Sequence, residues 1–268
     1  MNQDLDNLAF SEHQSKDTET DVFVIELPHV EQVGNWDCGL ACIQMVLSND
    51  LAQQLCQNLS SICPDEYQNK STWTIDLCYI LNHFSMKIKY YTKTLGVNPS
   101  FSKEKFYDSY ILKDEERVNQ RFQEAASKGI SIETGSLEIN ELIHHIKQNG
   151  VVIALVDVNQ LECVSCKSLV NNIGNFVRTL FNAQLSFNGH YIVICGFDTK
   201  KKLIYYRDPA VKSGIVLFNS IRSPFITSCR NITSKFFITT ELCCLTFSSF
   251  ERTRQAHGTD EDIILIYR

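Results

Sequence analysis

Residues 189–210 read GHYIVICGFDTKKKLIYYRDPA, and this stretch carries the clearest β-strand pattern in the chain. Apolar and aromatic side chains fill both arms around the turn-prone TKK, a pattern typical of a β-hairpin. If the two strands are symmetric about Thr199, His190 lies directly opposite Asp208. Directly opposed residues have Cβ atoms roughly 4.5 to 5.5 Å apart, which lets a carboxylate orient an imidazole. The hairpin therefore predicts a general base together with the acid that orients it.

A candidate nucleophile lies far upstream, in the stretch QVGNWDCGLACIQMVL over residues 32–47. Its apolar residues recur at helical spacing from Asp37, which occupies the expected N-cap, so Cys38 falls in the first turn. The helix dipole and the unpaired N–H groups of a first turn stabilise a thiolate. Gly39 lets a substrate carbonyl approach the backbone, where the Cys38 N–H can hold an oxyanion, and Gln32 can supply a second donor.

Each of these residues also has an ordinary structural interpretation. Cys38 can be a small buried hydrophobe, and His190 a half-buried histidine at the start of a strand. Asp208 can belong to the Asp-Pro turn that often ends a strand. The catalytic interpretation depends on the three occurring together, a helix-start cysteine with a paired histidine and aspartate.

The remaining periodicities predict an α+β fold in which N-terminal helices pack on a C-terminal antiparallel sheet. Ser71 and Thr72 are the expected caps of the second helix. A long loop is expected from Val158 to Gly189, and residues 211–247 are irregular in character. Helices are predicted over 37–47, 73–84, 114–129 and 136–150, and strands over 87–92, 151–157, 190–198, 203–210 and 258–268.

Composition narrows the class of protein and its partners. Twenty-five Lys and Arg against 31 Asp and Glu give a net charge of -6, and no basic stripe points to nucleic acid. Residues 1–20 are polar and charged, which predicts a disordered tail before one domain over 21–268. The tail lacks a signal-peptide pattern, and no apolar run approaches the ~18 residues that span a bilayer. We therefore expect an intracellular protein, cytoplasmic or nuclear, that has no membrane partner.

The eleven cysteines and the remaining histidines show no metal-site spacing. Cys163 and Cys166 form one CxxC pair, but no second pair or suitable histidine pair accompanies it, so free thiols are expected. His144 and His145 lie on a predicted helix, one facing solvent and one packed. No metal or other cofactor is expected.

Two sets of motifs carry family resemblances. QVGNWDCGLAC, GHYIVICGFD and RDPA resemble the bacteriocin-leader-processing peptidases and other papain-like enzymes. That resemblance implies a papain-like fold, with catalytic roles for Gln32, Cys38, His190 and Asp208 in this order. WDCGLAC, STWTIDL, TLGV, EERVNQ and GTDEDI resemble the guanylyl cyclase domain-containing protein family, from about Leu27 to Tyr267.

The second resemblance implies a different activity, the conversion of GTP to cyclic GMP with a divalent metal. The sequence shows neither the two metal-binding aspartates of class III cyclases nor a Gly-rich phosphate loop. It also departs from the family at residues 211–240, which look like an insertion and are consistent with a splice variant.

Three functions remain at this point. The leading one is an intracellular thiol hydrolase that acts on a peptide, isopeptide or other amide through an acyl-enzyme. The alternatives are guanylyl cyclase activity and a non-catalytic papain-like scaffold that binds protein partners. Trp36 and Trp73 are candidates for lining the groove beside Cys38, although Trp73 also fits a core position.

Overall fold

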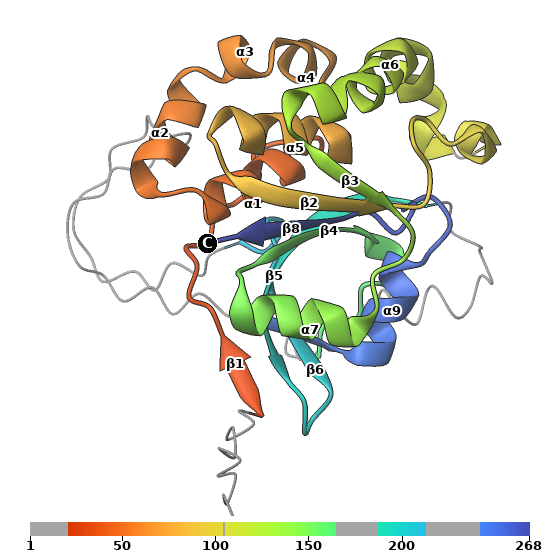
Figure 1. Ribbon diagram of the computed structural model, residues 1–268. Coiled ribbons are helices and arrows are strands. Elements are labelled where there is room, and N and C mark those ends of the chain that lie inside the picture. Colours follow the sequence, from red (N-terminus) through yellow and green to blue (C-terminus); the bar gives the residue numbers. More distant parts are fainter. Residues whose placement is uncertain (1–20, 104, 165–186, 213–241) are drawn as a thin grey trace, which may run out of the picture.

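The computed structural model describes residues 21–103, 105–164, 187–212 and 242–268, and within them eight strands form one mixed sheet (Figure 1). The predicted tail over 1–20 and almost all of the expected insertion at 211–240 lie outside the described residues, as does most of the loop expected after Val158. The strands are β1 Val22–Val24, β2 Lys87–Thr92, β3 Ser131–Thr134, β4 Val152–Asp157, β5 Gly189–Asp198, β6 Leu203–Arg207, β7 Cys243–Thr246 and β8 Ile263–Tyr267.

The sheet runs in the order β3-β2-β8-β4-β5-β6-β7, and β1 pairs with β5 off this path. The β2 and β3 strands are parallel, whereas the other pairs are antiparallel. The protein is therefore α+β, as expected, but the prediction of a C-terminal antiparallel sheet is wrong in part. The sheet takes strands from both halves of the chain and contains a parallel pair.

Helices cover both faces of the sheet: α5 and α6 lie on one side, and α7 and α9 on the other (Figure 1). Helix α1 packs against β5, as expected for an N-terminal helix that packs on the sheet. The described helices are α1 Cys38–Val46, α2 Asn49–Gln57, α3 Leu59–Ile62, α4 Pro64–Asn69, α5 Thr74–His83, α6 Lys105–Glu124, α7 Ile139–Gln148 and α9 Phe247–Arg254, with short 3-10 turns at Pro99–Lys103, Ala125–Lys128 and Val158–Gln160. None of these helices is both long and apolar enough to cross a membrane.

Gly39 allows α1 to pack closely on its neighbours. A Cβ atom at this position would lie 2.9 Å from a methyl carbon of Leu77 and 3.1 Å from the ring of Tyr191. The sequence predicts that Gly39 opens the backbone to a substrate, but here it faces α5 and β5. The residue therefore brings the first turn of α1 against the sheet.

The hairpin of β5 and β6 forms, but the predicted register is wrong. Asp198 pairs with Leu203, which leaves a four-residue turn over 199–202, and a β-bulge lies between Ile194 and Gly196. The longer turn moves the pairing away from symmetry about Thr199, and the extra residue of the bulge moves it part of the way back.

Two smaller expectations are also corrected. Ser71 and Thr72 do not cap the helix predicted over 73–84, which is α5 in the structure. This helix begins after Trp73, whose backbone N–H donates to Asp76 Oδ2 at 2.9 Å. The end of the stretch expected to be irregular forms β7, which extends the sheet beyond β6.

Candidate active site

Cys38 is the first residue of α1 and is 7% exposed. The preceding Asp37 occupies the N-cap position as predicted, but its side chain does not cap the helix. Instead Asp37 Oδ2 accepts from the Val33 N–H and Oδ1 accepts from the Gly34 N–H, both at 2.9 Å. Asp37 therefore orders the loop before the helix, and no side-chain cap occupies the first N–H groups of α1.

The predicted contact between His190 and Asp208 is present. Nε2 of His190 lies 2.8 Å from Oδ1 of Asp208, and both side chains are buried. The Ala210 N–H also donates to Asp208 Oδ1, at 2.9 Å. With Nε2 engaged by the carboxylate, Nδ1 is the ring nitrogen left for another partner.

Cys38 also forms a hydrogen bond with the His190 side chain. Burial would lower the pKa of His190, but hydrogen bonds to Asp208 and Cys38 and the charges of both outweigh it, raising the pKa to about 10. The imidazole is therefore held in its charged form near neutral pH. An imidazolium beside a thiol favours the thiolate, which is the nucleophilic form of cysteine.

The carboxyl group of Asp208 is held in its ionised form. Burial would raise its pKa, but the hydrogen bond from His190 and the charge of that ring outweigh it, so the pKa lies below its ordinary value. His29 bonds to the backbone carbonyl of Asp208 at 2.9 Å through Nε2. The end of β6 is thereby tied to the segment that leads into α1.

Gln32 lies in that same segment, and its backbone N–H donates to the Pro209 carbonyl at 2.9 Å. Its side-chain Nε2 donates to the Gly34 carbonyl at 2.7 Å. The Oε1 atom is buried and has no hydrogen-bond partner among the described residues. The structure thus places Gln32 in the loop that precedes α1, beside the end of β6. One of its side-chain N–H groups is already bonded within this loop.

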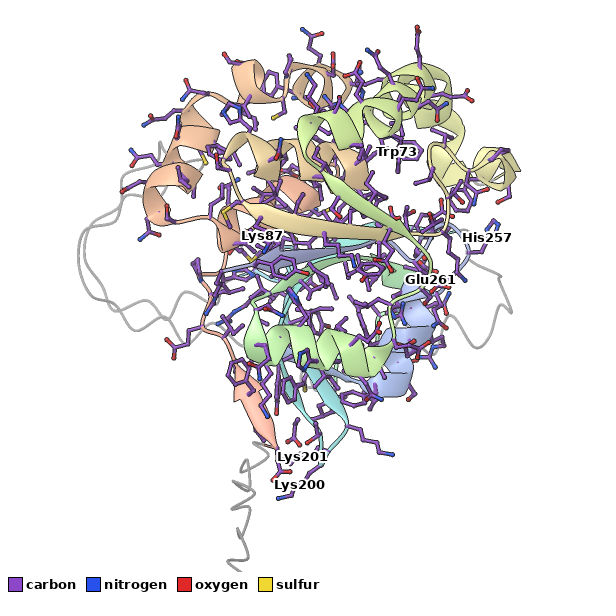
Figure 2. The ribbon with its side chains drawn as sticks, in the orientation of Figure 1. Trp73, Lys87, Lys200, Lys201, His257 and Glu261 are labelled. Atoms are coloured by element: carbon purple, nitrogen blue, oxygen red, sulfur yellow. The ribbon has the colours of Figure 1, made fainter. Side chains whose placement is uncertain are left out.

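Cys38 lines an open cavity that encloses about 800 Å³, solvent at its mouth included. Aromatic side chains from several elements line it, namely Trp36, Trp73, Tyr90, Phe101, Phe122 and Tyr191. Trp73 also packs on the core, so both interpretations of this residue hold. Figure 2 shows His257 and Glu261 near each other beside the sheet and Trp73 in the helical layer above it, all away from the hairpin tip marked by Lys200 and Lys201.

The sequence does not single out two acidic residues that line this cavity, Asp260 and Asp262. Burial raises the pKa of Asp262 to about 7. The negative charge of Asp260 raises this pKa further, whereas hydrogen bonds with Thr74 and Thr92 lower it. Both acids lie in GTDEDI, a polar stretch that is typical of a loop. Only the run of apolar residues that follows it indicates that the segment enters the sheet.

The other candidate residues lie apart from the cavity. Cys163 is buried and Cys166 lies outside the described residues. His144 is exposed and His145 is buried against the Ile266 carbonyl, which confirms the predicted arrangement. Among the described residues, no three His, Cys, Asp or Glu side chains lie together in a way that could hold a metal ion.

Comparison with known proteins places the chain in a family. The sequence model of a family described as guanylylate cyclase matches residues 27–223. The chain belongs to this guanylyl cyclase family. The "Guanylyl cyclase 1" of Arabidopsis thaliana is 34% identical over 244 residues, which cover 90% of this chain and 76% of that protein. The predicted resemblance to the guanylyl cyclase domain-containing family is confirmed, and the family match spans the four predicted site residues.

Proposed function

We propose that this protein is a papain-like thiol hydrolase that cleaves a peptide, isopeptide or other amide. The observation that carries the proposal is the connected series Cys38, His190 and Asp208, with Cys38 in the wall of an aromatic cavity. A helix that begins with the nucleophile and packs on the strand that carries the base is the arrangement of papain-like enzymes. The series supports covalent acyl transfer, because it joins an activated nucleophile to an oriented acid–base group.

The reaction uses these groups in two stages. The Cys38 thiolate attacks the substrate carbonyl carbon, and the C–N bond breaks as His190 gives its Nδ1 proton to the leaving amine. Water then attacks the thioester, His190 takes a proton from it, and the acid product leaves with regenerated Cys38. The Cys38 N–H and the side-chain amide of Gln32 are the proposed donors to the oxyanion in both stages.

An acylation experiment tests this proposal without knowledge of the natural substrate. The folded protein is mixed with p-nitrophenyl acetate, and the mass increase of one acetyl group is mapped by mass spectrometry. We expect Cys38 to carry the acetyl group, and His190→Ala to suppress it. Acetylation spread evenly over the cysteines contradicts a Cys-His pair, as does an equal rate of acetylation in the unmodified protein and in His190→Ala. Either result favours a non-catalytic scaffold that binds protein partners.

The second candidate function is the conversion of GTP to cyclic GMP and pyrophosphate. The family description and the name of the Arabidopsis relative favour it. The acids of the cavity fit the required divalent metal poorly. Asp260 Oδ1 already accepts from the Asn98 side-chain amide at 2.7 Å and from the Thr94 hydroxyl at 3.2 Å, and burial raises the pKa of Asp262 to about 7. Metal ligands must be deprotonated and available.

Direct assay separates the two functions. The protein is incubated with GTP and Mg²⁺ or Mn²⁺, and cyclic GMP is measured by mass spectrometry, with Cys38→Ala in parallel. We expect no cyclic GMP above a no-protein control. Production that survives in Cys38→Ala and is lost in Asp260→Asn establishes the cyclase function instead.

A further inference from the structure

Asp262 differs from the other acids near the sheet because part of its carboxyl group is buried without a partner. The side chain is 8% exposed, and Oδ1 has no hydrogen-bond partner among the described residues. The same residue lines the cavity that contains Cys38. A buried carboxylate oxygen without a donor costs free energy, so its retention in a cavity wall points to a ligand that supplies the donor.

The backbone around Asp262 holds the carboxyl group in place. The two residues before it, Asp260 and Glu261, both adopt left-handed conformations, with φ of 49° and 54°. Such angles are unfavourable for residues other than glycine and persist where the surrounding structure demands them. The Asp262 carbonyl accepts from the Leu155 N–H at 3.0 Å, and the Asp260 carbonyl accepts from the Lys93 N–H at 2.8 Å. The segment is therefore fixed on β4 and on the end of β2.

The cavity walls favour a cation over an anion. Two of its lining residues are acidic, and its lining lysine, Lys70, stands over the rings of Trp36 and Tyr67 at 4.7 and 4.0 Å. The aromatic rings that form the remaining walls attract cations through their faces and pack against aliphatic chains. A carboxylate behind aromatic walls suits a ligand with an apolar stem and a positively charged tip.

We propose that this cavity recognises an alkylammonium group of the substrate, such as a lysine side chain, with Asp262 Oδ1 as its buried acceptor. This inference rests on the proposed function, since it assigns a substrate class to the cavity beside Cys38. It assigns Asp262 to substrate binding, and Asp262 takes no part in bond breaking. Asp262 is a specificity-determining residue.

Binding of small probes tests the inference independently of catalysis. Both tryptophans of the chain, Trp36 and Trp73, line the cavity, so intrinsic fluorescence reports its occupancy. Nα-acetyl-lysine methylamide, its norleucine analogue and its glutamate analogue are titrated into Cys38→Ala protein at pH 8. We expect the lysine probe to bind at least about tenfold more tightly than the norleucine probe, as one charge-assisted hydrogen bond predicts.

A matched pair of variants locates the effect. Asp262→Asn should remove most of the lysine preference, whereas Asp198→Asn should retain it. Asp198 is another buried aspartate, 2% exposed, at the hairpin tip, where it bonds to the Lys201 N–H at 2.8 Å. If Asp262→Asn fails to fold by circular dichroism, the three-probe comparison in Cys38→Ala protein remains decisive.

The outcomes separate this inference from the proposed function. Equal binding of the lysine and norleucine probes, or tighter binding of the glutamate probe, overturns the inference even if Cys38 becomes acetylated. A preference for the lysine probe that depends on Asp262 supports the inference. If Cys38 is not acetylated, this preference still shows that the cavity binds an alkylammonium group, although the proposed catalysis fails.

Discussion

Nε2 of His190 lies 2.8 Å from Oδ1 of Asp208 although the two residues are not paired across the hairpin. Val193 pairs with Arg207, and continuing this register brings His190 level with Ala210. Asp208 is therefore a diagonal neighbour of His190, at a spacing that long side chains can bridge. The β-bulge between Ile194 and Gly196 sets this diagonal, so the local irregularity of β5 determines which acid meets the imidazole.

Cys38 is expected to be the most reactive thiol of the described residues at pH 6. Its hydrogen-bond partner His190 can take up and return a proton, whereas burial raises the pKa of Cys42, Cys63 and Cys78. Limited iodoacetamide labelling with mass spectrometry gives the order of reaction. His190→Ala should slow labelling of Cys38, and His145→Ala, which removes another buried histidine, should not. Equal labelling in all three proteins contradicts the Cys-His pair.

Replacement of Asp208 separates an orienting role from a structural one. Asp208→Asn keeps an oxygen that accepts from His190 Nε2, so substantial acylation of Cys38 should remain. Asp208→Ala removes that acceptor and should slow acylation on the order of 10- to 100-fold, because the ring is no longer oriented. Acetylation rates with p-nitrophenyl acetate measure both, with circular dichroism as the folding control. Equal rates in the two folded variants would mean that Asp208 only ends a strand.

The charge of His190 predicts a pH dependence with a definite sign. Its pKa rises from 6.5 unfolded to about 10 in the fold, so its contribution to stability is complete below about pH 6.5 and is lost as pH rises through about 10. Nuclear magnetic resonance titration should show His190 still protonated at pH 8, with a lower pKa in Cys38→Ala. His145 is the control, because burial lowers its pKa. A His190 pKa below 6.5 contradicts the arrangement.

The buried charges that join α4, α5 and α6 should contribute strongly to the stability of the helical layer. Arg121 bonds to Asp76 at 2.6 Å and also to Glu66, and both carboxylates are fully buried. Arg121→Met leaves them without one of their cations and should lower the free energy of unfolding by about 3 kcal/mol. Arg252→Met breaks a half-exposed pair with Glu162 and should cost less than about 1 kcal/mol. Urea unfolding measures both, and equal losses contradict the expectation.

Elements with a clear local pattern were predictable from the sequence, whereas those that depend on distant partners were not. The β2 and β4 strands and the hairpin carry continuous apolar or alternating residues. The β1 and β3 strands have only three and four residues, with mostly exposed side chains, and they become strands by pairing with β5 and β2. Short edge strands of this kind have little local signal.

The same division applies to the candidate site. Cys38, His190 and Asp208 could be named from the sequence because a helix start and a hairpin are local features. The diagonal contact of His190 with Asp208 depends on the β-bulge, which the sequence did not predict. Asp262 was missed because its burial arises from Leu155 and from α5, which are remote in sequence. Side-chain use was also unpredictable, since Asp37 can serve either the helix or the loop and the structure decides for the loop.

The position of β8 affects how the chain can fold while it is being synthesised. This strand follows every other strand in sequence yet lies between β2 and β4. Until the ribosome has released the residues from Ile263 onward, β8 is missing from the sheet. The edges of β2 and β4 that pair with β8 are then unpaired, beside the apolar core. Such edges invite association with other chains, so the growing polypeptide is exposed to aggregation until the last strand inserts. A shortened product that ends before Asp262 would lose both this residue of the cavity wall and the strand between β2 and β4.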